Sequence, residues 1–177
     1  GKVKERYNGS GATVRGFNVE GRAAFTRWFE LQAGVTLQQS RYKEPEFWSE
    51  DAEVPPVRRM FRTPDAYGYF TASFKPVRNF TADLSGTCTG SMLVQHMAGS
   101  GVAQDVAVST PSFFDMNIRL SYDVRIYKEI TMQLYGGVQN LFNAYQKDFD
   151  KGVDRDSGYI YGPSLPRSWF VGAKFSF

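Results

Sequence analysis

The sequence predicts an all-β fold, an antiparallel up-and-down meander of about seven long strands that forms a segment of a transmembrane β-barrel. Apolar and polar residues alternate with a period of two, the alternating runs are long, and short connections alternate with long ones. Soluble strands are typically about 5 to 6 residues long, whereas a tilted strand needs about 9 to 11 residues to cross a bilayer. The runs in this chain therefore favour strands that cross a membrane.

The alternation places strands at residues 14–26, 29–42, 66–76, 79–95, 114–126, 130–139 and 167–177. In the clearest run, 79–95, apolar or small residues occupy the even positions and Thr, Ser, Asp or Gln the odd ones, and only Leu93 breaks the pattern. Residues 114–126 alternate in the same way, with charge along the polar face. The final run ends on the aromatic Phe177, where soluble chains usually end in frayed polar residues.

The connections between these strands fall into two classes. Short links are expected at residues 26–28, 77–78 and 127–129, and long segments at residues 43–63, 97–111 and 140–166. Membrane barrels have short turns on the periplasmic side and long loops on the outer side. The pattern therefore puts the end of the chain on the short-turn side.

Composition narrows the function classes. The 177 residues carry a net charge of +3, with 42% hydrophobic and 16% aromatic residues, which excludes a disordered chain. No run approaches the roughly 18 consecutive apolar residues of a spanning helix. The basic residues are spread along the chain, so a nucleic-acid partner is not expected. The single Cys88 excludes an internal disulfide and is interpreted as a small apolar filler.

The two faces of the predicted sheet differ in composition. The polar face is mainly Thr, Ser, Gln, Asn and Tyr. This composition suits an aqueous lumen, whereas the exposed face of a soluble barrel is usually rich in Lys and Glu. Aromatic residues crowd the strand ends and match the interfacial girdles of membrane barrels: Phe25, Trp28, Phe29, Phe74, Phe80, Tyr127, Trp169 and Phe177. A soluble up-and-down barrel or sandwich is the alternative.

The odd number of strands indicates a piece of a larger barrel, because bacterial single-chain barrels have an even number. Residues 1–12 resemble the tail of a polar loop, and residues 1–6 are too charged for a signal peptide. We expect the chain to be the C-terminal portion of a longer protein.

Motifs near the end of the chain resemble a known family. The run Gln139-Asn140-Leu141-Phe142-Asn143-Ala144-Tyr145 is followed by a Gly-Pro and Pro-Arg segment at residues 158–167 and by a final strand ending in Phe177. This arrangement resembles the carboxyl end of TonB-dependent outer-membrane receptors. The match is most specific over about the last forty residues and architectural before them.

The resemblance implies a 22-stranded barrel in the bacterial outer membrane, filled by an N-terminal plug domain of which this chain contains nothing. It implies energy-coupled uptake of a scarce nutrient, such as a ferric siderophore, cobalamin or a glycan, rather than an enzymatic reaction or a bound cofactor. The implied partners are outer-membrane lipid, the nutrient, the outer-membrane assembly machinery, and an inner-membrane energising complex that acts through the missing N-terminal part.

The final strand also resembles the signal read by the assembly machinery, with Gly172, Phe175 and Phe177 in the expected spacing. Phe170 departs from that signal, because its position is normally polar. The alternative is that these residues pack against lipid and the first strand.

Ligand contacts in such a receptor are expected in the long loops. The candidates are aromatic and basic residues: Trp48, Arg58, Arg59, Arg62, Tyr145 and Tyr159. The arginines suit an anionic metal chelate, and pairing with neighbouring acids is the alternative role.

Two further features were considered as sites. Residues 148–156 hold four carboxylates that suit a calcium ion, although the spacing lacks the closing Glu of an EF-hand, and a solvated turn is the alternative. His96 is the only histidine, so a Ser-His-Asp triad or a zinc site would have at most one imidazole to draw on, and an interfacial polar role is preferred over a haem or metal ligand.

Two other functions remain open from the sequence. The chain could be a small self-contained outer-membrane barrel with an adhesive or structural role, which would recruit residues 2–8 as an eighth strand. An outer-membrane phospholipase or protease would need a nucleophile and base for which no motif is present.

Overall fold

The computed structural model describes residues 9–99 and 101–177, so the proposed eighth strand at residues 2–8 lies outside the described residues. The strands are β1 (Ala12–Thr26), β2 (Phe29–Glu46), β3 (Val57–Arg59), β4 (Ala66–Phe74), β5 (Phe80–Thr89), β6 (Leu93–His96), β7 (Val106–Ser109), β8 (Phe113–Tyr127), β9 (Ile130–Gln139) and β10 (Ser168–Ser176). The described part of the chain contains no helix long and apolar enough to cross a membrane.

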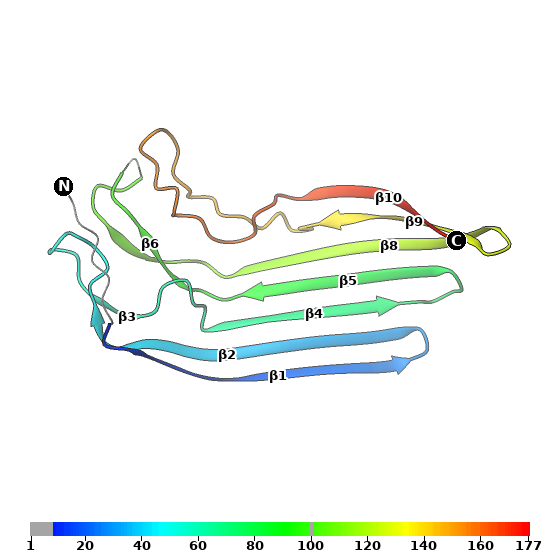
Figure 1. The fold of residues 1–177 in the computed structure, drawn as a ribbon, viewed down its shortest axis with the longest axis horizontal. Helices are drawn as coiled ribbons and strands as arrows, with labels where there is room; N and C mark the ends of the chain where they lie inside the picture. Colours follow the sequence, from blue (N-terminus) through cyan, green and yellow to red (C-terminus); the bar gives the residue numbers. More distant parts are fainter. Residues whose placement is uncertain (1–8, 100) are drawn as a thin grey trace.

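The long strands form one antiparallel meander in the order β1-β2-β4-β5-β8-β9-β10 (Figure 1). β3 pairs with the outer end of β2, and β6 pairs with β7 in a separate two-stranded sheet. β1 and β10 are edge strands of the main sheet within the described residues. The predicted meander is therefore present as an open sheet.

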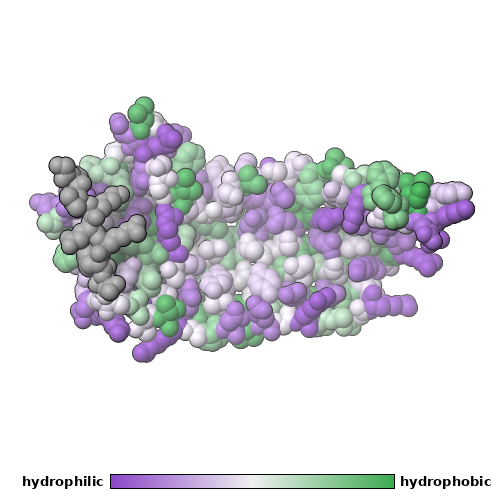
Figure 2. All heavy atoms as spheres, in the orientation of Figure 1, coloured by the Kyte–Doolittle hydropathy of each residue, from purple (hydrophilic) through white to green (hydrophobic). Residues whose placement is uncertain are grey.

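The register assigns each residue to a face, because directly opposed residues point to the same side. Leu84 lies opposite Ala72 and Ile118 on the apolar face. Thr71 lies opposite Gln32 and Ser85 on the polar face. In the view of Figure 2 the central strands carry mixed purple and white residues, and green apolar residues gather toward the turn end.

The apolar face of the sheet is uncovered. Val171 is 90% exposed and Trp169 77% exposed, and other apolar residues of this face are also open: Phe17, Val19, Val35, Leu37, Leu120, Leu134 and Phe175. The buried cluster instead lies in the loops, where Val94, Tyr159 and Tyr161 pack together. A face this large and apolar needs a partner to leave water.

Aromatic side chains line the turn end of the first strands. The ring centroids of Phe25 and Phe29 are 5.5 Å apart, those of Phe29 and Phe74 are 4.6 Å apart, and Trp28 lies 6.1 Å from Phe29. Rings at this spacing form a continuous row. The predicted grouping of aromatic residues at the strand ends is present here.

The strand expected over residues 79–95 differs most from the structure. β5 ends at Thr89, and residues 93–96 form β6 in the separate sheet. The chain leaves the main sheet at Gly90, where an added Cβ would lie 2.6 Å from the carbonyl oxygen of Ala66. Leu93, which breaks the alternation, forms a parallel bridge with Phe61. Most ends of the other predicted strands lie within a few residues of the observed strand ends.

Strands β8, β9 and β10 approach one another closely at Gly137. An added Cβ there would collide with the carbonyl oxygen of Ile118 and lie 2.7 Å from the Phe170 ring. We expect Gly137→Ala to lower the free energy of unfolding by about 1–3 kcal/mol. Gly21→Ala is the matched control, because nothing lies within 4 Å of its added Cβ. Equal unfolding temperatures for the two variants would contradict this packing.

Candidate functional site

The long connections meet at one end of the sheet, opposite the short turns (Figure 1). We define the loop cluster as three segments, residues 47–65, residues 90–99 with 101–112, and residues 140–167. Arg62 joins all three segments, because its backbone amide donates to the Leu93 carbonyl at 2.7 Å and its guanidinium donates to the carbonyls of Ile160 and Gly158. The three segments therefore form one connected body.

Tyr159 is at the centre of the loop cluster. Its side chain is 2% exposed and its ring stacks on the His96 ring, with centroids 3.7 Å apart and an interplanar angle of 3°. Its hydroxyl donates to Asp148 at 2.8 Å, and the Tyr161 hydroxyl donates to the other Asp148 oxygen at 2.5 Å. One carboxylate thus holds two buried tyrosines.

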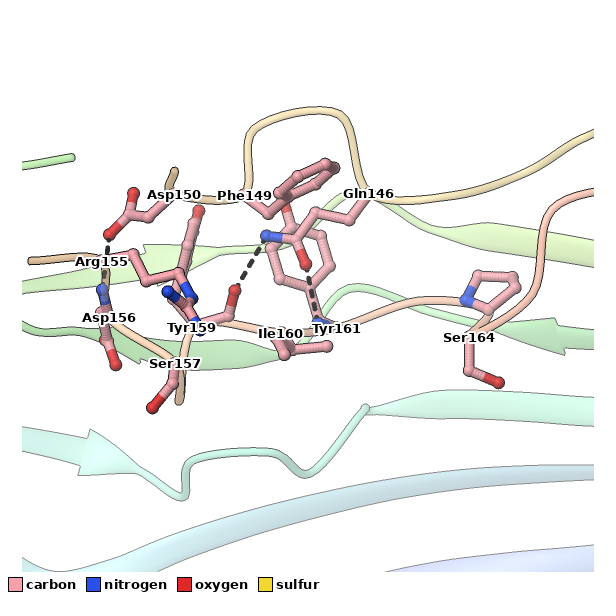
Figure 3. A pocket seen from close by; sticks show the side chains of 11 residues that line it. Gln146, Phe149, Asp150, Arg155, Asp156, Ser157, Tyr159, Ile160, Tyr161 and Ser164 are labelled. Carbon is pink, nitrogen blue, oxygen red and sulfur yellow. Dashed lines mark hydrogen bonds between the residues drawn. The ribbon is translucent and has the colours of Figure 1, made fainter. Parts of the chain in front are cut away.

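The Gln146 side chain hydrogen-bonds to the backbone of the same segment. Its Nε2 donates to the Tyr159 carbonyl at 3.1 Å, and its Oε1 accepts from the Tyr161 amide at 2.9 Å (Figure 3). A side-chain amide has both a donor and an acceptor, so it can hydrogen-bond to a carbonyl and to an N–H of one backbone segment, as a neighbouring strand would. Gln146 therefore fixes the chain between residues 159 and 161.

His96 and Asp150 connect two of the loop segments across 54 residues of sequence. Nε2 of His96 lies 3.0 Å from each Asp150 carboxylate oxygen, and the two side chains are 7% and 3% exposed. Asp150 also accepts from the Asp156 amide at 3.0 Å, and Asp156 accepts from the Met97 amide at 2.8 Å. The acidic run and the lone histidine thus share one network, which the sequence pattern did not reveal.

Three of the four carboxylates at residues 148–156, those of Asp148, Asp150 and Asp156, therefore accept hydrogen bonds from within the loop cluster. In residues 9–99 and 101–177, no group of three or more His, Cys, Asp or Glu side chains is placed to hold a metal ion. The solvated-turn alternative is closer to the geometry than the calcium site, because residues 151–155 are exposed while Asp150 and Asp156 are half-buried.

The network shifts the pKa values of its members. The Asp156 amide, and then His96, hold the pKa of Asp150 below its usual range. Burial alone would raise the pKa of Asp148, but the hydrogen bonds from Tyr161, Tyr159 and other donors outweigh burial and lower it. Burial and the bond to Asp148 raise the pKa of Tyr161 to about 12, and burial raises that of Tyr159 further.

These shifts predict how the loop cluster depends on pH. Depressed carboxylate pKa values stabilise the cluster above the usual Asp pKa of about 4, and this contribution is lost as pH falls through the folded-state values. Raised tyrosine pKa values stabilise it below about pH 10, and this contribution is lost as pH rises. We expect absorbance at 295 nm to show a tyrosine ionising near pH 12 that Tyr161→Phe removes. Tyr145→Phe is the control, and an unchanged titration of Tyr161→Phe would contradict the assignment.

A cavity of about 440 Å³ opens beside this network (Figure 3). Its walls combine the apolar side chains of Phe149, Ile160 and Pro163 with polar groups from Arg155 and Ser157. Its volume lies in the range of small-molecule pockets, which pair apolar walls with a few polar groups. The arrangement can hold a small organic ligand.

Each predicted ligand-facing arginine donates at least one hydrogen bond within the protein, while the buried Nε of Arg59 has no partner among the described residues. Arg58 is exposed and donates to the Lys43 carbonyl. Arg59 pairs with Asp65 at 3.0 Å and donates to the Ser91 carbonyl at 2.7 Å, and Arg62 donates to the two carbonyls described above. The pairing of Arg59 fits the alternative role of these residues.

The predicted aromatic residues occupy different settings. Trp48 is half-buried, donates to the Pro55 carbonyl at 3.3 Å and lies edge-on to Phe61 at 5.3 Å. Tyr145 is 40% exposed, and Tyr159 lines the 440 Å³ cavity although its ring is buried. Ligand contact by these residues stays a prediction.

The fold of this chain is similar to that of a solved import receptor. No protein-family model and no curated protein matches the chain. Among solved structures, the ferric-catecholate import receptor Fiu from Escherichia coli K12, in a closed form, aligns with 92% of this chain at a TM-score of 0.64 and 20% sequence identity. The chain spans about a fifth, 20%, of the length of that receptor. The match confirms the predicted fold class, a meander like a segment of the barrel of TonB-dependent receptors.

Proposed function

We propose that this chain forms part of the outer-membrane barrel of a TonB-dependent receptor that takes up a scarce nutrient, a ferric siderophore, cobalamin or a glycan, with energy from the inner membrane. The observation that carries the proposal is the division of the molecule into two parts. The main sheet leaves an entire apolar face uncovered, whereas the buried cluster lies in the loops at one end. The fold shared with a ferric-catecholate import receptor supports it.

Acyl chains are the partner that suits the apolar face. Leu84, Leu120, Leu134 and Phe175 all lie on it, and the last three are exposed. β10 is 9 residues long, which gives about 27–30 Å of strand. At a tilt of about 40° this length covers roughly 20 Å along the membrane normal, close to the ~25 Å apolar band of outer-membrane barrels.

The polar face suits a water-filled lumen. Its side chains bond to one another along the sheet: Asn18 to Thr36 at 3.0 Å, Gln133 to Asp123 at 2.9 Å, and Arg119 to Gln133 at 3.2 Å. The Arg119 guanidinium also lies 4.5 Å from the centre of the Tyr135 ring. Polar ladders of this kind stay hydrated without needing apolar cover.

The remaining roles follow from this placement. The loop cluster would meet the nutrient, through residues such as Trp48, Arg58, Arg59, Arg62, Tyr145 and Tyr159. The assembly machinery would recognise Gly172 and Phe175 on β10, an edge strand within the described residues, and Phe177 directly after it. The plug and the contact with the energising complex would belong to the rest of the receptor.

Uptake measurements in the native cell test the proposal. The gene that encodes this chain would be deleted, and uptake of radiolabelled ferric catecholates, cobalamin and oligosaccharides compared with the parent strain. We expect one class to be lost, restored by the gene, and lost again when the inner-membrane energising protein is removed. If the deletion strain takes up all three classes normally and loses adhesion instead, the small adhesive barrel is favoured.

A further inference from the structure

A second cavity, of about 260 Å³, lies between the polar face of the sheet and the part of the loop cluster that folds over it. Thr87 and Thr89 of β5 and Asp115 of β8 form its floor, and Gly162 belongs to the loop above. Thr87 and Asp115 are directly opposed in the register, so both point to the polar side. The cavity therefore lies against the wall, and it shares only Pro163 with the lining of the 440 Å³ cavity.

Asp115 has no partner in this cavity. Its Oδ1 atom is buried and has no hydrogen-bond partner among the described residues, while the residue as a whole is half-buried. Two other carboxylates of the polar face are satisfied: Asp83 accepts from Ser73 and Asp123 accepts from Gln133. Enclosing an unpaired carboxylate costs free energy, so a buried carboxylate normally has a donor or a cation beside it.

The other walls specify the kind of group that completes the site. The hydroxyls of Thr87 and Thr89 can accept hydrogen bonds, and Phe113 contributes an aromatic ring to the same cavity. Aromatic faces and carboxylates together favour cationic nitrogen groups. We propose that this cavity binds a compact cationic nitrogen group, an ammonium or a guanidinium, against Asp115.

Gly162 shows that the cover over the site is closely fitted. Its φ is +82°, in the left-handed region that glycine favours, and an added Cβ would lie 2.8 Å from Cζ of Phe113. The loop can thus reach the Phe113 ring only with glycine at this position. The fit limits the site to a small group rather than a bulky ligand.

Two sources can supply the same cationic group. One is a free amine or guanidine on a ligand that enters the lumen, and the other is a lysine or arginine from the segment that fills the lumen of the full-length protein. The inference rests on the proposed function only in calling this face a lumen. The test uses binding to purified protein, so its outcome is distinguishable from a failure of the uptake experiment.

The first experiment is saturation-transfer NMR on the purified full-length protein in detergent, with methylammonium and methylguanidinium as probes. We expect binding to the wild type and at least about tenfold weaker binding to Asp115→Asn, because a charge-assisted hydrogen bond is lost. Asp83→Asn is the matched control, since it removes a carboxylate from the same face but outside the cavity.

A second measurement tests whether a lysine or arginine of the protein itself occupies the cavity, because such a side chain would exclude the probes. A paired Asp115 would make Asp115→Asn unfold at a lower temperature than the wild type, and a lysine partner would form a carbodiimide cross-link to Asp115. An unpaired Asp115 would instead leave the variant as stable as the wild type or more stable. Absence of probe binding together with no loss of stability would overturn the proposal.

Discussion

Replacing Leu120 by arginine is expected to lower the free energy of unfolding of the membrane-embedded protein by about 2–4 kcal/mol, because the charge would enter the hydrocarbon near the midplane. Leu120 is 47% exposed and lies opposite Ala82 and Gly136 on the apolar face. In a soluble protein the same half-exposed position would tolerate arginine within about 0.5 kcal/mol. The size of the effect therefore reports the surrounding medium.

The measurement is a denaturant titration of the full-length protein in lipid bilayers, together with the amount of protein recovered from outer membranes. Thr71→Arg is the matched control, because Thr71 is exposed on the polar face between Gln32 and Ser85. We expect this control to assemble and to unfold like the wild type. If Leu120→Arg and Thr71→Arg behave alike, the apolar face does not meet lipid.

The division of the sheet into two faces could be predicted from the sequence because the side-chain period of a strand is exactly two residues. Leu84, Ala72 and Ile118 come from three separate alternating runs, and the register brings them together on one face. Once each run is assigned its apolar face, a slip of one residue in any pairing would turn the apolar side chains of that run to the other side. This local rule explains why the meander was predictable without any knowledge of long-range contacts.

The ends of the strands near the loops were less predictable, because they depend on pairings with distant residues. β2 continues to Glu46, where it lies opposite Val57 of β3, and this pairing has no signature in the alternation. β6 leaves the main sheet because Leu93 bridges Phe61 instead of continuing the ladder with β4. A pattern of period two cannot tell which sheet a strand joins.

The Asn140-Leu141-Phe142-Asn143 motif could be seen in the sequence, and the structure gives its physical role. Asn140 adopts a positive φ of 49°, and its side chain donates to the carbonyls of Ala144 and Leu165 at 2.9 and 2.8 Å. The Asn143 side chain accepts from the Arg167 amide at 3.0 Å. The motif thus ties the beginning of the last long loop to its end.

The network around His96 could not be predicted, because its members are far apart in sequence. Nothing near His96 in the chain indicates Asp150, and the stacking of Tyr159 on the imidazole depends on how residues 140–167 fold back. Sequence reasoning recognised the tyrosine, the histidine and the acidic run as separate features. Only the packed loops combine them.

Truncating Tyr159 is the second change with a large expected effect, about 3–5 kcal/mol for the loss of a fully buried aromatic side chain. Tyr159→Ala would remove the ring that stacks on His96 and packs with Val94, and would leave Asp148 with one donor fewer. Tyr159→Phe keeps the ring and removes only the hydroxyl, so we expect a smaller loss of about 1–3 kcal/mol.

We expect the loss of stability in Tyr159→Ala to be confined to the loop cluster. Among the described residues, no hydrogen bond of Tyr159 reaches a strand of the main sheet. Hydrogen exchange of the full-length protein measures this directly. In Tyr159→Ala the amides of residues 93–96 and 156–161 should exchange faster, while the amides of β4 and β5 keep their protection. Tyr145→Ala is the matched control, since Tyr145 is 40% exposed and is not part of the buried cluster.

The same pair of variants separates a structural role for Tyr159 from direct ligand contact. If the ring only organises the loops, Tyr159→Phe keeps more of the protection of residues 93–96 than Tyr159→Ala does, and the affinity for the transported nutrient changes in step with that protection, because the ring and its stacking on His96 remain. If the hydroxyl touches the nutrient, Tyr159→Phe keeps the protection and still loses affinity. Uniform loss of protection through β4 and β5 in Tyr159→Ala would show instead that the loop cluster and the wall unfold as one unit, coupled through Phe113 of β8, which packs against the buried cluster.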